Sequence, residues 1–257
     1  MKPRILPLLG LLATVNLPAQ SMEELMRKAM EQQGGQQKVT IEENRDPFVP
    51  LTFTGSYRME VHTYKSGKEE KDSPVNLVMA FKPDAMAMEP NSGGKAQARM
   101  VFDLKGKLMY TLMTDDKGQR SGIKMKMMKM NVEGSAGGPT KDAKVERTNE
   151  TKVIDGRTCI KYTYSDATGR GEAWVAEEVK WDMMTVLNEM LGGRGTEAWQ
   201  RGGMGGLMME NTWNSADGKE KVVMYTRDVV QGKVNDALFS TAGYTIQDMS
   251  AFSTFGQ

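Results

Sequence analysis

From residue 53 onward the chain alternates between apolar and polar side chains. Phe53, Gly55, Tyr57, Met59 and Val61 alternate with polar residues, and a period of two places the two sets on opposite faces of a strand. Similar alternating runs recur at 75–81, 100–104, 108–113, 145–154, 158–164, 172–176, 207–213 and 222–230. Turn-forming residues separate these runs, so the pattern predicts an antiparallel β-meander.

Two other segments carry apolar residues at helical spacing. Ser21 and Glu24 form a capping box ahead of an apolar stripe within residues 22–33, and a second stripe lies within residues 179–191. The glycine-rich segment 192–206 that follows lacks the Lys-Ser/Thr ending of a phosphate-binding loop. We therefore expect an α+β fold, in which the meander forms an incomplete barrel closed by an N-terminal amphipathic helix and an inserted helix.

Two local signals refine the predicted meander. Asp155-Gly156 lies between two alternating runs and is a strong signal for a two-residue hairpin turn. In the stretch GIKMKMMKMNV at 122–132, Met125 and Met127 alternate with lysines until Met128 breaks the alternation. This break predicts a bulge or a strand end at Met128.

The first residues have the form of an export signal. Lys2 and Arg4 precede an apolar run at 5–15, and Ala19 ends a segment suited to cleavage. The run is shorter than the roughly 20 residues that a membrane-spanning helix needs. We therefore expect cleavage after Ala19 and a periplasmic or secreted mature chain without a transmembrane span. The expected organisation is a signal peptide at 1–19, a helix and connector at 20–50, one half-barrel domain at 51–250 and a tail at 251–257.

Composition and motifs offer little for catalysis. Lys and Arg number 34 against 33 Asp and Glu, so net charge gives no argument for a nucleic-acid partner. The single histidine, His62, is expected on the outer face of its strand, and the single cysteine, Cys159, is expected to be a buried inert thiol. Carboxylate pairs of the glycosidase type stay open, because so many acids always include some pair. We expect a non-enzymatic protein with no catalytic residues and no cofactor.

Methionine is the unusual feature of the composition, with 23 residues. Three interpretations are open: ordinary core residues, an adaptable apolar surface for ligands, or a soft-metal site for Cu(I) or Ag(I). Lysines beside the cluster and the lack of nearby histidine or cysteine count against the metal. The candidate metal ligands are Met125, Met127, Met128 and Met130.

The ligand interpretation places a lipid, an acyl chain or a hydrophobic peptide between the concave sheet and the two helices. The candidate lining residues are Phe53, Tyr57, Met59, Met79, Phe81, Met86, Met88, Met100, Met109, Met183 and Leu187. A third class of function is a sensor or scaffold that binds an envelope protein, for which we would expect a large exposed apolar patch. The sequence identifies no protein partner.

Three segments resemble a family of exported bacterial proteins known as domain of unknown function 4412. They are TNETKVIDGRTCIKYTYSD, GEAWVAEEV and VNDALFSTAGYTIQDM. The matching positions are Thr151, Lys152, Ile154, Gly156, Cys159, Tyr162, Trp174, Val175, Asp236, Phe239, Gly243 and Tyr244. Ala242 stands where the family usually has proline, and the resemblance covers roughly residues 53–248.

The order of the expected elements also resembles the lipoprotein-carrier fold of periplasmic lipoprotein-sorting proteins. In those proteins an incomplete antiparallel barrel is closed by helices and holds acyl chains. The resemblance implies a carrier of a hydrophobic ligand. The lone arginine inside the barrel of those carriers has no match here.

Overall fold

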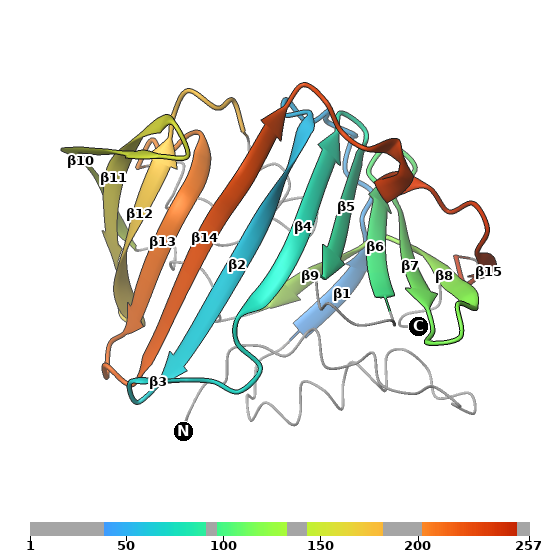
Figure 1. Ribbon diagram of the computed structural model, residues 1–257, viewed down its shortest axis with the longest axis horizontal. Coiled ribbons are helices and arrows are strands. Elements are labelled where there is room, and N and C mark those ends of the chain that lie inside the picture. Colours follow the sequence, from blue (N-terminus) through green and yellow to red (C-terminus); the bar gives the residue numbers. More distant parts are fainter. Residues whose placement is uncertain (1–38, 91–96, 133–142, 182–201, 251–257) are drawn as a thin grey trace.

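A computed structural model of the chain shows two β-sheets, of which the larger is one curved sheet of 13 strands (Figure 1). The structure describes residues 39–90, 97–132, 143–181 and 202–250. The elements are β1 (Val39–Glu43), β2 (Gly55–Lys65), β3 (Lys68–Glu69), β4 (Val75–Lys82), β5 (Ala85–Pro90), β6 (Gln97–Asp103), β7 (Leu108–Thr114), β8 (Arg120–Lys126), β9 (Met128–Val132), β10 (Lys144–Ile154), β11 (Arg157–Ser165), β12 (Gly169–Ala176), β13 (Leu207–Ser215), β14 (Glu220–Gln231), the 3-10 helix η2 (Asp236–Phe239) and β15 (Thr245–Asp248).

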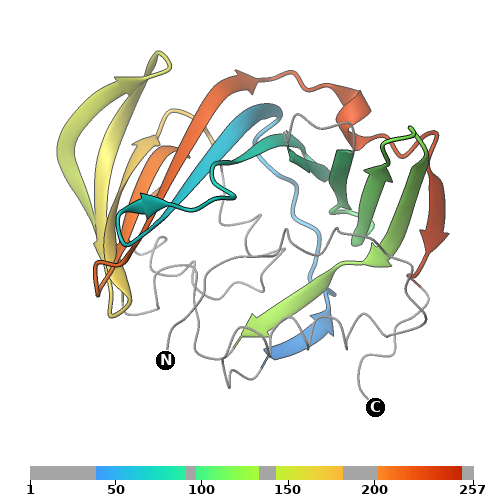
Figure 2. The ribbon, with the colours of Figure 1, turned by 60° about the horizontal axis from the view of Figure 1, so that its bottom comes forward.

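The large sheet has the strand order β10-β11-β12-β13-β14-β2-β4-β5-β6-β7-β8-β15, with β3 paired to β2. All its pairs are antiparallel except β15 with β8, so the predicted meander is confirmed. The sheet is open, and β1 and β9 form a separate antiparallel pair on the inner side of its curve (Figure 2). Half-barrel therefore describes its shape well.

The predicted helices are not part of what the structure describes. The stretch 22–33 and residues 182–191 lie outside the described residues, and within the described ranges η2 is the one helix. Val179 and Trp181 were expected to begin the inserted helix, but they lie in a non-helical segment and are both buried. Their side chains enter the same core although they are only two residues apart, as in an extended chain. The described part of the protein is therefore nearly all β, whereas the sequence predicted an α+β fold.

The segment expected to be a polar connector contains a strand. β1 occupies residues 39–43 and pairs with β9, which places Glu43 opposite Met128 and Ile41 opposite Met130. The connector continues the ladder through the backbone amide of Asn44, which donates to the carbonyl oxygen of Met127 at 3.0 Å. β1 and β9 are far apart in the sequence, so no local sequence pattern predicts that they pair.

The predicted hairpin turn at Asp155-Gly156 and the predicted strand break at Met128 are both confirmed. Asp155 and Gly156 have φ of 47° and 76° and connect β10 to β11, as a two-residue hairpin turn with two left-handed residues requires. β8 ends at Lys126 and β9 begins at Met128. The chain thus leaves the large sheet for the small one at the position where the alternation breaks.

Strands β4 to β7 carry different side chains on their two faces. On the face turned toward β1 and β9, direct cross-strand neighbours form one ladder through Phe81, Met86, Phe102 and Met109. A second ladder on this face passes through Tyr57, Met79, Met88 and Met100. We call these eight residues, with Met59, the methionine face.

The opposite face of the same strands carries smaller side chains and is covered by a segment near the C-terminus. It carries Ala80, Ala87, Val101 and Leu112, which are all buried. Five apolar residues of the segment 233–248 pack on this covered face: Val234, Leu238, Phe239, Tyr244 and Ile246. We call this segment the C-terminal strap, and Figure 1 shows it crossing the outside of the sheet in red.

Polar contacts hold the C-terminal strap in place. Arg99 donates to the carbonyl oxygens of Ala237 and Ser240 at 2.8 and 3.1 Å. Lys82 pairs with Asp236 at 2.6 Å and lies 4.7 Å from the centre of the Phe239 ring. Asp236, Phe239 and Tyr244, which belong to the family pattern, therefore fasten the strap to the covered face.

Candidate functional site

Four aromatic rings gather at one end of the methionine face. Phe53, Tyr57 and Phe81 surround Trp181, with ring centroids 5.2, 6.2 and 4.3 Å from the indole. Phe81 is fully buried, and the other three rings are at most 8% exposed. Burial raises the pKa of the Tyr57 hydroxyl above its ordinary value, so this phenol stays neutral.

The methionines of this face differ from the rings in burial. Met86 is 1% exposed, whereas Met59, Met79, Met88, Met100 and Met109 are only partly buried. They lie on several neighbouring strands, and Met59, Met79, Met100 and Met109 pack against the core cluster that contains Phe81, Met86 and Phe102. The register brings together all the predicted lining residues within the described ranges, while Met183 and Leu187 lie outside them. Their role in binding stays a prediction.

A hollow of about 380 Å³ adjoins the aromatic cluster. Its wall includes Phe53, which also contacts Trp181, together with the oppositely charged Glu178 and Lys180. The remaining lining residues are Thr52, Thr54, Gln231 and Gly232. Sequence reasoning missed both this hollow and Trp181, because the segment that supplies Lys180 and Trp181 was assigned to the helix expected at 179–191.

The four methionines of the metal alternative lie in the large sheet, in the small sheet and, for Met127, in the link between β8 and β9. Met125 lies on β8 directly opposite Met109 of β7, and Met127 follows it as a buried core residue at 3% exposure. Met128 and Met130 belong to β9 in the small sheet. Within the described ranges, no group of three or more His, Cys, Asp or Glu residues is placed to hold a metal ion. The thioether alternative stays an untested prediction.

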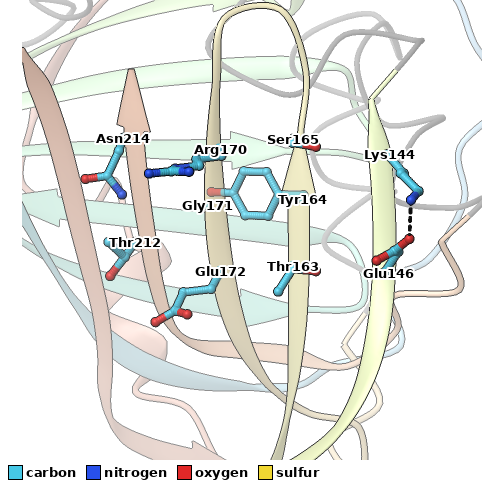
Figure 3. Close-up of a pocket in the computed structure, with 10 residues that line it drawn as sticks. All are labelled: Lys144, Glu146, Thr163, Tyr164, Ser165, Arg170, Gly171, Glu172, Thr212 and Asn214. Atoms are coloured by element: carbon cyan, nitrogen blue, oxygen red, sulfur yellow. Dashed lines mark ion pairs between the residues drawn. The ribbon is translucent and has the colours of Figure 1, made fainter. Parts of the chain in front are cut away.

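A second hollow, of about 440 Å³, lies over strands β10 to β13. Figure 3 shows its side chains in two rows across the strands. The first row is Lys144, Ser165, Arg170 and Asn214, and the second is Glu146, Thr163, Glu172 and Thr212. One row is cationic and the other anionic, and Lys144 pairs with Glu146 at 2.6 Å. These side chains are exposed or half-buried, as on a solvated sheet face.

Residues of the family pattern form a tie between β10, β12 and β13. Lys152 lies 4.4 Å from the centre of the Trp174 ring and forms an ion pair with Glu210. Arg227 of β14 also reaches Glu210, at 3.3 Å. Cation–π and ion-pair contacts of this kind hold neighbouring strands in register, and they indicate a structural role for this part of the pattern.

Tyr162, another pattern residue, anchors the chain where β12 ends. Its hydroxyl donates to Glu177, which also accepts two hydrogen bonds from Arg147 at 2.8 and 3.1 Å. Burial and the Glu177 carboxylate raise the pKa of Tyr162 to about 12. The tyrosine is thus a permanent donor that fixes Glu177 beside β10.

The two residues weighed for catalysis occupy settings that differ from a catalytic dyad. His62 lies between Glu60 and Glu69, each 2.6 Å from one of its ring nitrogens. Burial opposes its charge, but the hydrogen bonds to Glu69 and Glu60 raise the pKa of His62 above its ordinary value. Cys159 is fully buried, and burial raises the pKa of its thiol, as expected for an inert cysteine.

The fold and this face define a class: an open antiparallel half-barrel whose inner side carries an apolar, partly buried face. The chain belongs to the DUF4412 family, a domain of unknown function, whose model matches residues 53–243. No curated protein matches the chain. Among the described residues, no helix combines the length and apolar character that crossing a membrane requires.

Solved structures offer only distant likenesses. PNGF-II is 12% identical, with a TM-score of 0.36, over 76% of this chain, and the match spans 31% of PNGF-II. A DUF1329 family protein from Desulfovibrio piger is 9% identical over 74% of this chain and 91% of its own, with a TM-score of 0.22. A Vibrio parahaemolyticus domain described as an outer membrane lipoprotein-sorting protein is 8% identical over 73% of this chain and 89% of its own, with a TM-score of 0.24. Scores this low carry no argument about fold or function.

Proposed function

We propose that this chain is an exported, non-enzymatic protein that holds a lipid or an acyl chain on the methionine face. The observation that supports this most directly is the contiguous row of partly exposed methionines on the inner side of the half-barrel. Export is supported by the charged and apolar order of the first residues. The periplasm and the cell exterior are the compartments that fit this proposal.

The physics of the face suits a ligand of variable shape. Methionine is unbranched and polarizable, so its side chain adapts to different apolar partners. Each methylene group of a bound chain that leaves water contributes about 0.8 kcal/mol. A saturated acyl chain laid across four strands therefore gains substantial free energy from non-directional contact, without a catalytic group.

Native mass spectrometry of the exported protein tests the proposal. We expect the mature protein, purified gently from a periplasmic extract, to carry adducts of several hundred daltons that fragment to acyl chains. The double variant Met79→Glu with Met100→Glu should lose these adducts, because two carboxylates on the methionine face cannot be desolvated cheaply. The matched control is Val153→Glu, which places a carboxylate at a position that is 70% exposed on β10.

Two results would contradict the proposal. A bare protein mass, together with no binding of the apolar dye Nile red, would show that the methionine face is only a core surface. Adducts at the mass of copper or silver that disappear on Met125→Leu would instead favour the thioether metal site, for which Met109 and Met125 are neighbours across β7 and β8.

A further inference from the structure

The indole nitrogen of Trp181 is a buried donor without an acceptor among the described residues. The residue is 5% exposed, and its Nε1 has no hydrogen-bond partner within the ranges that the structure describes. Buried tryptophans usually pair this N–H, because an unpaired buried donor destabilises the folded state. An exception in a native structure therefore needs a physical explanation.

The neighbours of Trp181 explain why the described part of the chain supplies no acceptor for this donor. The rings of Phe53, Tyr57 and Phe81 pack around the indole at 5.2, 6.2 and 4.3 Å between centroids. The rings of Phe53 and Phe81 carry no acceptor, and the Tyr57 hydroxyl does not accept a hydrogen bond from the indole. The donor thus lies within the apolar cluster at the end of the methionine face, where an apolar ligand would bring its own polar atom.

We infer that the Trp181 Nε1–H donates a hydrogen bond to the carbonyl oxygen of an acyl ligand whose chain lies on the methionine face. This inference rests on the proposed function and adds the polar contact that fixes the ligand. The hollow next to Phe53 has a volume of about 380 Å³ and accommodates the group attached to that carbonyl. Phe53 lines the hollow and contacts Trp181, so the two places are adjacent.

The charges of the hollow point to an ester rather than to a free acid. Glu178 and Lys180 both line it, so a negative and a positive side chain face the same space. Their opposite charges leave no net preference for an anionic head group. The indole is a neutral donor, and a neutral ester carbonyl is the acceptor that it binds without an ionic partner.

The test compares three ligands with the same chain length. Methyl palmitate has a carbonyl and no charge, palmitic acid has both, and hexadecane has neither. Each displaces Nile red from the full mature protein, from Trp181→Phe and from the control Trp213→Phe, which changes a tryptophan of the separate cluster around Tyr162 and Tyr164. Phenylalanine keeps an aromatic ring but removes the N–H together with the five-membered ring of the indole, so the hexadecane affinity serves as the measure of the lost packing.

The expected result is selective. Trp181→Phe should bind methyl palmitate and palmitic acid roughly tenfold more weakly, because the ligand carbonyl loses its partner. Its affinity for hexadecane should stay unchanged, and so should all affinities of Trp213→Phe.

Other results would overturn the inference in distinguishable ways. An equal loss for all three ligands would mean that Trp181 acts by packing alone, and a loss for palmitic acid only would mean that charge is recognised. If the unaltered protein binds none of the three, the proposed function itself fails. Should Trp181→Phe not fold, the proton resonance of the Trp181 indole in the unaltered protein decides: methyl palmitate must shift it downfield and hexadecane must not.

Discussion

The two faces of strands β4 to β6 are built from neighbouring residues and yet end in different states. On the covered face, Ala80 and Ala87 are 1% exposed under the C-terminal strap. On the methionine face, Met79 and Met88 are the next residues along the same strands and remain partly exposed. The same backbone therefore carries one face that is covered by the strap and one on which buried side chains such as Phe81 and Met86 lie beside partly exposed methionines.

Side-chain size explains the difference between the faces. Alanine lets the strap approach the sheet closely, and Gly122 does the same for β15, since a Cβ there would lie 2.7 Å from the Ile246 Cδ1. Fixed polar contacts from Arg99 and Lys82 then hold the strap. Methionine on the other face offers long, adaptable side chains instead, which suit a partner that is not fixed in shape.

The largest expected effect on stability comes from the aromatic cluster at the end of the methionine face. Phe81 is fully buried and contacts three other rings, so Phe81→Ala removes a large side chain from a packed cluster. We expect the free energy of unfolding to fall by about 3–5 kcal/mol, measured by urea denaturation. A loss below about 1 kcal/mol would mean that the cluster around Phe81 is loosely packed.

Adjacent substitutions compare the faces directly. Ala87→Leu forces extra methylene groups beneath the strap and should cost about 1–3 kcal/mol of unfolding free energy. Met88→Leu, one residue further on the methionine face, conserves volume and should cost less than about 1.5 kcal/mol. Urea denaturation of both variants is the measurement, and equal costs would contradict the contrast between a filled face and an accessible one.

The strap should depend on Arg99. Arg99→Met keeps an apolar stem but removes both donors to the carbonyl oxygens of Ala237 and Ser240. We expect a loss of about 1–3 kcal/mol and faster proteolysis within residues 233–248. The control is Arg120→Met, because Arg120 contacts the Tyr244 ring at 5.7 Å and should matter less. If both variants behave alike, packing alone holds the strap.

The smallest effect concerns His62, on the opposite side of β2 from Met59. Its pKa is raised in the folded protein, so its stabilising contribution is fully present below the ordinary histidine pKa and is lost as pH rises through the raised value. Melting temperatures should therefore fall as the pH rises from the ordinary histidine pKa through the raised pKa of His62. His62→Gln should flatten this dependence. An unchanged slope would show that Glu60 and Glu69 do not stabilise the charged imidazole.

Local pattern predicted most of the large sheet. The alternation around Met79 and Met88 placed both on one face, and Asp155-Gly156 fixed the β10–β11 register, because each signal acts within a few residues. β15 has only four residues and pairs with a strand more than a hundred residues earlier, so no local signal marks it. The same reason hid β1.

The candidate site was predictable in its apolar part and not in its polar part. The alternation of side chains along β2 and β4 places Tyr57, Met79 and Phe81 on the same face as neighbours. Trp181 enters the cluster from a segment that the helical stripe misassigned, and only its packing places the indole there. Polar contacts between distant segments, such as Lys152 with Trp174 and Glu210, likewise follow from the fold rather than from spacing.

Methionine methyl spectroscopy tests the central claim most directly. The mature protein, labelled with ¹³C at the methionine methyl groups and assigned by single Met→Leu variants, is titrated with methyl palmitate. The account predicts shifts for the methyl groups of Met79, Met88 and Met100, and none for the buried Met208 and Met209. Shifts confined to methionines outside the methionine face, or no saturable shift at all, would contradict it.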